Sequence, residues 1–207
     1  MNNAALGYQA LDACTTGNSN TALGQGAGGA VTTGGSNSFV GKDAGQSITT
    51  GSFNTGIGSN ALRDVTTGGS GVAVGINAAL TATGSNIVAI GANTLRGSSN
   101  NTGSDNVAVG TGAMRNSTTG SENVAVGKDS LYENTTGGNN TAVGRLSLDA
   151  NTTGNDNVAI GNVALTNATT ASNNTAVGSR CLLTNTTGSS NTGVGHDCLE
   201  SSTTSDN

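Results

Sequence analysis

The chain has 207 residues, of which 34 are Gly, none is Pro or Trp, and 9% are charged, with a formal net charge of −5. So few large apolar residues cannot fill a broad globular core, while recurring Val, Ile and Thr with sparse charge argue against disorder. The chain has no Lys/Arg cluster and no long apolar run, so we expect neither nucleic-acid binding nor membrane insertion. The N-terminal residues lack the basic and apolar regions of a signal peptide.

One unit of 17 residues recurs along the whole chain. Each copy contains a triplet such as Ala22-Leu23-Gly24, and its final Gly is numbered position 0 below. The spacing of these glycines is 17 residues, except for one interval of 16 and one of 19. A fixed period of this size predicts a solenoid, in which each repeat forms one coil and stacks on the next. The glycines at position 0 are Gly7, Gly24, Gly41, Gly58, Gly75, Gly91, Gly110, Gly127, Gly144, Gly161, Gly178 and Gly195.

Positions −4 to 0 of each unit predict a short strand. Position −1 is always Val, Ile or Leu, position −3 varies among Val, Thr, Ser and Ala, and position −2 is Ala except at Phe39, Gly56 and Gly193. Because successive side chains of a strand point to opposite faces, −3 and −1 share one face and −2 lies on the other. The fold class is therefore all-β: a single domain over 1–207, a parallel β-solenoid of about 12 coils. At about 4.8 Å per coil the rod would be on the order of 55 to 60 Å long.

The rest of each unit predicts turns and ladders. A second apolar site at +3 and +4, such as Ala61-Leu62, is interpreted as a second, shorter strand or an extended corner. Gly at −7 predicts a positive φ where the backbone reverses. Asn at −4, as in Asn140, predicts a stacked ladder of amides. Thr at −8, as in Thr136, predicts a ladder that caps the turn.

Phe39 indicates which face lies inside the coil. It replaces the small −2 residue where the +4 residues of the neighbouring units are Gly28 and Gly45 instead of Leu. This exchange suggests that −2 and +4 share the interior, and that −1 points outward. A stripe of outward aliphatic side chains predicts homo-oligomerisation, and parallel rods favour cyclic symmetry. In the alternative arrangement, −1 fills the coil and Ala or Gly abuts a neighbouring chain. The two irregular intervals are expected to change the loop between +4 and −7, not the strand.

The sequence predicts no catalytic, cofactor-binding or metal site, and no enzyme. Cys181 and Cys198 both occupy +3 and are expected to stack as buried thiols without a disulfide, while Cys14 lies at another position. Three cysteines and one histidine have no zinc spacing. His196 beside Asp197 is interpreted as a surface residue, and the Gly-x-Gly strings follow from the repeat and not from a phosphate loop.

The segment from Thr119 to Gly127, Thr-Gly-Ser-Glu-Asn-Val-Ala-Val-Gly, resembles repeats of two known groups. One is the head domain of trimeric autotransporter adhesins. The other is a set of Thr-Thr-Gly-x-x-Asn-Thr-Ala-(Val/Ile)-Gly-x-x-Ala-Leu repeats in tail-fibre and related structural proteins of bacteriophages, notably cyanophages. The similarity extends over essentially the whole chain and is closer for the second group. The first group implies a left-handed parallel β-roll assembled as a trimer for adhesion, but its unit is shorter.

The expected function is a structural fibre module, a rigid rod that spaces or presents receptor-binding surfaces. The resemblance implies a homotrimer in a virion appendage, or another extracellular or cell-surface location, with a host receptor or glycan as partner. The alternatives are a bacterial adhesin head and an ice-binding solenoid that uses the Thr ladder. A polysaccharide-cleaving enzyme is disfavoured because no paired carboxylates recur in register. Asn3, at position −4, and Asn207, at position −5, both lie inside a repeat unit, so we expect a segment of a longer fibre or ends capped by partners.

Overall fold

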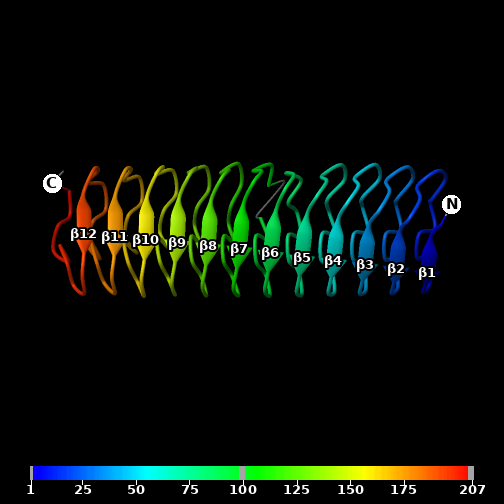
Figure 1. Ribbon diagram of the computed structural model, residues 1–207, viewed down its shortest axis with the longest axis horizontal. Helices are drawn as coiled ribbons and strands as arrows, with labels where there is room; N and C mark the ends of the chain where they lie inside the picture. The colour runs from blue at the N-terminus through cyan, green and yellow to red at the C-terminus, as the bar shows by residue number, and fades with distance from the viewer. Residues whose placement is uncertain (1, 98–100, 205–207) are drawn as a thin grey trace.

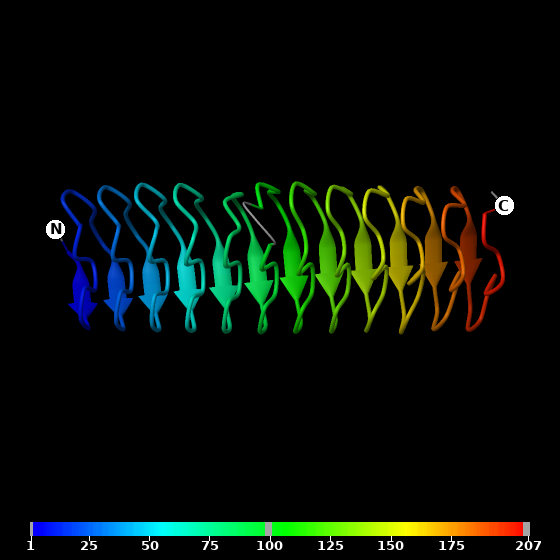
Figure 2. The same ribbon diagram turned by 180° about the vertical axis from the view of Figure 1, so that it is seen from behind.

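The computed structural model describes residues 2–97 and 101–204 and shows a rod of stacked coils (Figure 1). Twelve parallel strands form one sheet in which the spatial order is the order of the chain. Seen from behind, the strands still lie side by side along the rod (Figure 2). The predicted all-β parallel solenoid is confirmed. The strands are β1 (Ala4–Leu6), β2 (Thr21–Leu23), β3 (Ser38–Val40), β4 (Thr55–Ile57), β5 (Val72–Val74), β6 (Val88–Ile90), β7 (Val107–Val109), β8 (Val124–Val126), β9 (Thr141–Val143), β10 (Val158–Ile160), β11 (Thr175–Val177) and β12 (Thr192–Val194).

Every strand pairs in register with the equivalent residues of the next coil. Val107 pairs with Val124, for example, and Val109 with Val126. The register also continues across the two irregular intervals, where β6 pairs with both β5 and β7. The length changes therefore lie in the loops, as predicted, although part of the longer loop, 98–100, lies outside the described residues.

The segment after each position-0 glycine is a series of turns, so the predicted second strand or extended corner is wrong. Its residues at +2 and +4 have left-handed backbones, as in Asn60 (φ 59°) and Leu62 (φ 55°). Large residues rarely adopt this conformation, because the Cβ approaches the following carbonyl. Here it is held by bonds between coils, such as the one from the Leu62 amide to the Ala78 carbonyl at 3.0 Å.

The glycines at −7 have a different role from the predicted one. The positive φ values belong to the glycines at position 0, such as Gly127 (φ 136°), and not to those at −7. At −7 the constraint is close stacking, because a side chain on Gly120 would overlap the carbonyl oxygen of Gly137 in the next coil. The approach of two backbones thus favours Gly at −7, although Ala171 occupies this position in one coil.

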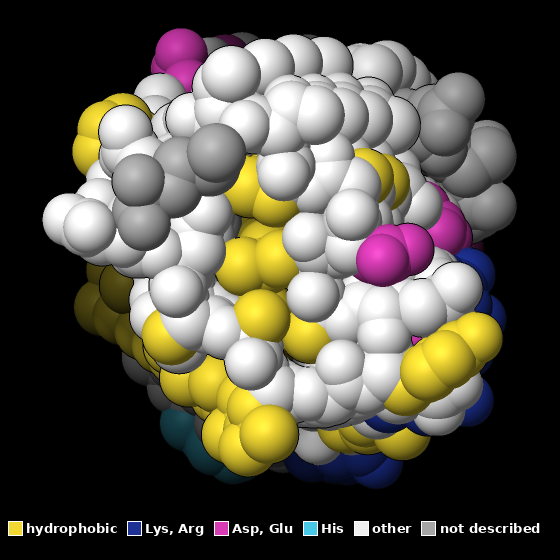
Figure 3. Space-filling view, turned by 90° about the vertical axis from the view of Figure 1, so that its right-hand side faces the viewer, with side chains coloured by type: hydrophobic (Ala, Val, Ile, Leu, Met, Phe, Trp, Pro, Cys, Tyr) yellow, Lys and Arg dark blue, Asp and Glu magenta, His cyan; other side chains and the backbone are white. Residues whose placement is uncertain are grey.

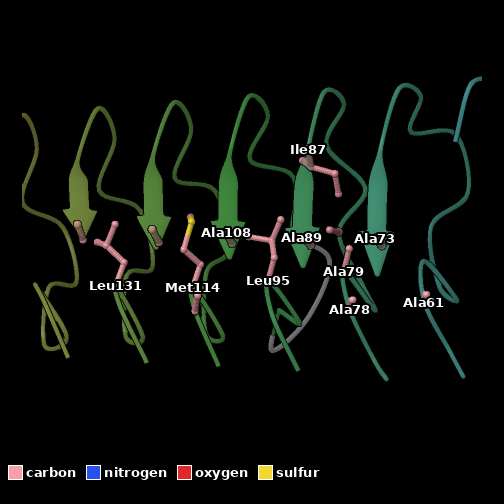
Figure 4. Packing of buried hydrophobic residues seen from close by; sticks show 14 of the residues in the cluster. Ala61, Ala73, Ala78, Ala79, Ile87, Ala89, Leu95, Ala108, Met114 and Leu131 are labelled. Atoms are coloured by element: carbon pink, nitrogen blue, oxygen red, sulfur yellow. The ribbon is translucent and has the colours of Figure 1, made fainter. Parts of the chain in front are cut away.

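The interior is one narrow stack of small and aliphatic side chains. The +4 residues Leu95, Met114 and Leu131 point toward the alanines of the strands (Figure 4). Seen from the N-terminal end, apolar side chains occupy the middle of the cross-section (Figure 3). Position −2 is therefore inside and −1 outside, as predicted from Phe39 and not as in the alternative arrangement.

Phe39 is completely buried, as predicted. A Cβ on Gly28 would lie 3.0 Å from Cδ2 of Phe39, and one on Gly45 would overlap the ring. The ring thus fills the space that two Leu side chains occupy elsewhere in the rod.

The predicted amide ladder is present at position −4. The side-chain oxygen of Asn140 accepts from the Asn157 backbone amide at 3.0 Å, and its Nδ2 donates to the Gly154 carbonyl at 2.8 Å. The ladder is interrupted where Gly71 and Ile87 replace Asn. Ile87 is buried there, and the Gly71 amide still donates to Oδ1 of Asn54 at 3.0 Å.

Replacing Phe39 by Ala should lower the free energy of unfolding by about 3–5 kcal/mol, because it leaves a cavity. Gly45→Leu alone should also destabilise, since Leu would overlap the ring. Together the two changes should recover much of the loss, because Leu62 shows that Leu fits the equivalent backbone. Urea denaturation of the four proteins in this double-mutant cycle measures the coupling, and purely additive losses would contradict a shared interior.

Asn140→Ala should lower the free energy of unfolding by at least about 3 kcal/mol, because it removes several buried hydrogen bonds and leaves partners unsatisfied. Thr136→Ala in the same coil is the control, since this side chain is exposed and should change stability by no more than about 0.5 kcal/mol. Equal effects in urea denaturation would argue against the ladder as a source of stability.

Candidate functional site

The outward face of the sheet is an uncharged, largely aliphatic strip that follows the whole rod. It is made by positions −3 and −1 of all twelve strands, none of which contains Lys, Arg, Asp, Glu or His. Its −1 side chains are half-buried to exposed, with 39% exposure at Ile160 and 71% at Leu6. The four central strands carry only Val and Ile on this face. This surface, called the sheet face below, is the outward stripe predicted from the sequence.

The size of the sheet face can be estimated from strand geometry. Twelve strands spaced by about 4.8 Å and three residues of about 3.3 Å each give roughly 570 Å². An apolar patch of this size is at the upper end of what monomers expose, and such patches often mark interaction sites.

The Thr rows at −9 and −8 precede the strand in each coil and are not part of the sheet face. The hydroxyls at −9 form the ladder, as in Thr135, whose Oγ1 donates to the Thr152 carbonyl at 2.8 Å. The residues at −8, such as Thr136, are exposed instead. The prediction that −8 forms the structural ladder is therefore wrong by one position, because the half-buried −9 hydroxyls make the bonds between coils while the −8 side chains are mostly exposed.

All basic residues lie in the segment after position 0, between +1 and +5. This distribution separates the charged side of the rod from the sheet face. The residues are Lys42, Arg63, Arg96, Arg115, Lys128, Arg145 and Arg180.

A shallow hollow of about 510 Å³ lies on this charged side, over three successive coils. Tyr132 and Leu146 provide apolar surface, and Arg115, Glu133 and Asp149 provide charged groups. Arg115 lies 5.7 Å from the centre of the Tyr132 ring and donates to its hydroxyl at 3.0 Å. This site was not predicted from the sequence, although the run of charged residues at +5 and +6 in adjacent units was a signal for it.

The carboxyl group of Asp149 is the perturbed titratable group of this hollow. Burial raises its pKa to about 6, and the negative charges of Asp129 and Glu133 add to the shift. The described residues give Asp149 no ion pair, whereas Asp129 has Lys128 at 3.6 Å. An aromatic ring beside a carboxyl group of raised pKa can bind a ligand that offers an apolar face and hydrogen-bond donors.

The prediction of buried, unbridged thiols is confirmed for Cys181 but not fully for Cys198, and the predicted surface position of His196 is confirmed. All three cysteines are free; Cys181 is buried, and Cys14 and Cys198 are half-buried. His196 is exposed, and its Nδ1 lies 2.9 Å from an Asp197 carboxylate oxygen. Within residues 2–97 and 101–204, no three His, Cys, Asp or Glu side chains are grouped so that they could hold a metal ion.

Comparison of the chain with protein-family models, with curated proteins and with solved structures gives no match in any of the three. In the part of the chain that the structure describes, no helix could cross a membrane. The sheet face and the hollow around Tyr132 are therefore the features from which a function can be inferred.

Asp149→Asn should stabilise the rod at neutral pH but not in acid. Because the folded pKa of about 6 lies above the ordinary value, Asp149 favours folding below about pH 4, and this contribution is lost as the pH rises through 6. The variant should therefore unfold at a higher urea concentration than the wild type at pH 7.5, and the difference should shrink toward pH 4. Asp156→Asn, which removes an exposed carboxylate, is the control. A pH-independent difference would contradict this assignment.

Proposed function

We propose that the chain is a structural rod module of a fibre, such as a bacteriophage tail fibre or a similar surface appendage, and that it acts as a homotrimer. The observation that carries this proposal is the sheet face, which is free of charge over all twelve strands. Three copies side by side, with their sheet faces toward a common axis, would cover this strip in every chain. Parallel copies in cyclic symmetry give an assembly with a defined direction, as a fibre requires.

The same rod supports a role in adhesion, as in an adhesin head. The charged side of each copy would then face outward and repeat in every chain, so weak sites would act together through avidity. The hollow around Tyr132 is the proposed contact for a receptor or glycan. Binding to a glycan array by the wild type, and its loss in Tyr132→Ala, would distinguish a receptor-binding piece from a spacer.

Ice binding is the second candidate, and the sheet face favours it more than the Thr rows do. The hydroxyls at −9, as in Thr135 and Thr152, donate to backbone carbonyls, so the −8 row supplies most of the exposed Thr side chains there. The sheet face has two outward ranks at regular spacing, with Thr at −3 in five of twelve strands. Thermal hysteresis of the purified chain would support this function, and its absence would exclude it. The five threonines at position −3 are Thr21, Thr55, Thr141, Thr175 and Thr192.

The trimer is tested by a lysine pair on the sheet face. The wild type should sediment as a trimer, and Val109→Lys combined with Val126→Lys should give a folded monomer, because these half-buried side chains lie in the middle of the strip. Thr119→Lys with Thr136→Lys adds the same charge at the exposed edge of adjacent coils and should leave the trimer intact. A wild type that is monomeric at tens of micromolar in sedimentation velocity would contradict the proposal.

A further inference from the structure

Two thiols meet inside the coils that contain β11 and β12. Cys181 and Cys198 both occupy position +3, which is Ala, Ser or Thr in the other units. Burial raises the pKa of the Cys181 thiol, and the neighbouring Cys198 adds to this shift. Beside them the coils are joined by the bond from the Leu182 amide to the Cys198 carbonyl at 2.8 Å.

Gly193 makes the space in which the thiols meet. It occupies position −2 in β12, where Ala is usual. A Cβ on Gly193 would lie 2.6 Å from Sγ of Cys181 and 3.5 Å from Sγ of Cys198. Both sulfur atoms therefore border the space that the Ala methyl group at position −2 fills in most other coils.

We propose that Cys181 and Cys198 are a redox modification site that forms a reversible disulfide between adjacent coils. Stacked coils are about 4.8 Å apart, which lies within the Cα separations of about 4.4–6.8 Å that disulfides span. The absence of a side chain at Gly193 leaves both sulfur atoms room to move toward each other. This site is independent of the proposed fibre role.

The order of reaction follows from access. Cys198 is half-buried and Cys181 is buried, so the Cys198 thiolate attacks a low-molecular-weight disulfide such as oxidised glutathione and releases one glutathione thiol. Cys181 then loses its proton and attacks the Cys198 sulfur, which releases the second glutathione. Two protein thiols are oxidised and one glutathione disulfide is reduced. Burial and the neighbouring Cys198 raise the pKa of Cys181, so a smaller fraction of this thiol is ionised than of an exposed thiol.

The test uses the reduced full chain with oxidised glutathione, followed by alkylation and intact-mass measurement. The expected product has lost two hydrogen atoms, keeps Cys14 as its single alkylatable thiol, and returns to three thiols with reductant. Amide exchange at Leu182 and Asp197, which bond across the two coils, should slow by about tenfold or more on oxidation. Three alkylatable thiols, a persistent glutathione adduct, or a disulfide between two chains would overturn the proposal.

Three variants locate the site. Cys181→Ser and Cys198→Ser should each abolish the intrachain disulfide, and Cys14→Ser should leave it unchanged. Gly193→Ala, which places a methyl group between the two sulfur atoms, should slow disulfide formation by about tenfold or more while circular dichroism remains that of the wild type. An unchanged rate in a folded Gly193→Ala variant would show that the space beside Gly193 is not needed, and would overturn this part of the inference.

Discussion

The structure depends on exact stacking of coil on coil, and the buried amide at −4 is the interaction that enforces it. Each side chain in this ladder bonds to the backbone of the following coil at two points, as Asn140 does with Asn157 and Gly154. A shift of one residue would leave a buried amide and a buried carbonyl without partners, which costs more than the bonds themselves contribute. The register in turn places every −1 side chain on one face, so the continuous sheet face is a consequence of the ladder.

Much of this fold could be predicted from the sequence because the repeat states the same constraints many times over. The period gave the coils, the alternation at −3, −2 and −1 gave the strand, and the exchange between Phe39 and the glycines identified the interior. The left-handed residues at +2 and +4 could not be predicted, since Leu and Val have no local preference for that conformation. Val163, with φ 51°, adopts it only because packing and bonds to adjacent coils favour the whole turn. The reason for Gly at −7 could not be predicted either, because a recurring Gly is the expected residue both where two backbones approach closely and where φ is positive.

The candidate sites differ in how they arise from the sequence. The sheet face belongs to every unit, so its aliphatic character could be predicted from one row of residues. The hollow around Tyr132 belongs to three particular units and combines residues at +2, +5 and +6, such as Leu146, Asp149 and Glu133. Its shape depends on which long side chains lie over which short ones, and this arrangement becomes visible only once the coils are stacked. The thiol pair could be predicted in part. The 17-residue spacing places the two cysteines in adjacent coils, whereas the space that Gly193 leaves beside them is visible only in the structure.

The break in the amide ladder has a mechanical consequence. Gly71 and Ile87 divide the ladder into a block that ends at Asn54 and a block that begins at Asn106, and both irregular repeat lengths fall between them. In a solenoid, stability is a sum over coils and their interfaces, so the weakest interface sets where cooperativity ends. We therefore expect the seam near β5 and β6 to divide the rod into two cooperative units, so that under tension the chain would unfold first at this seam while the stacks on either side stay intact.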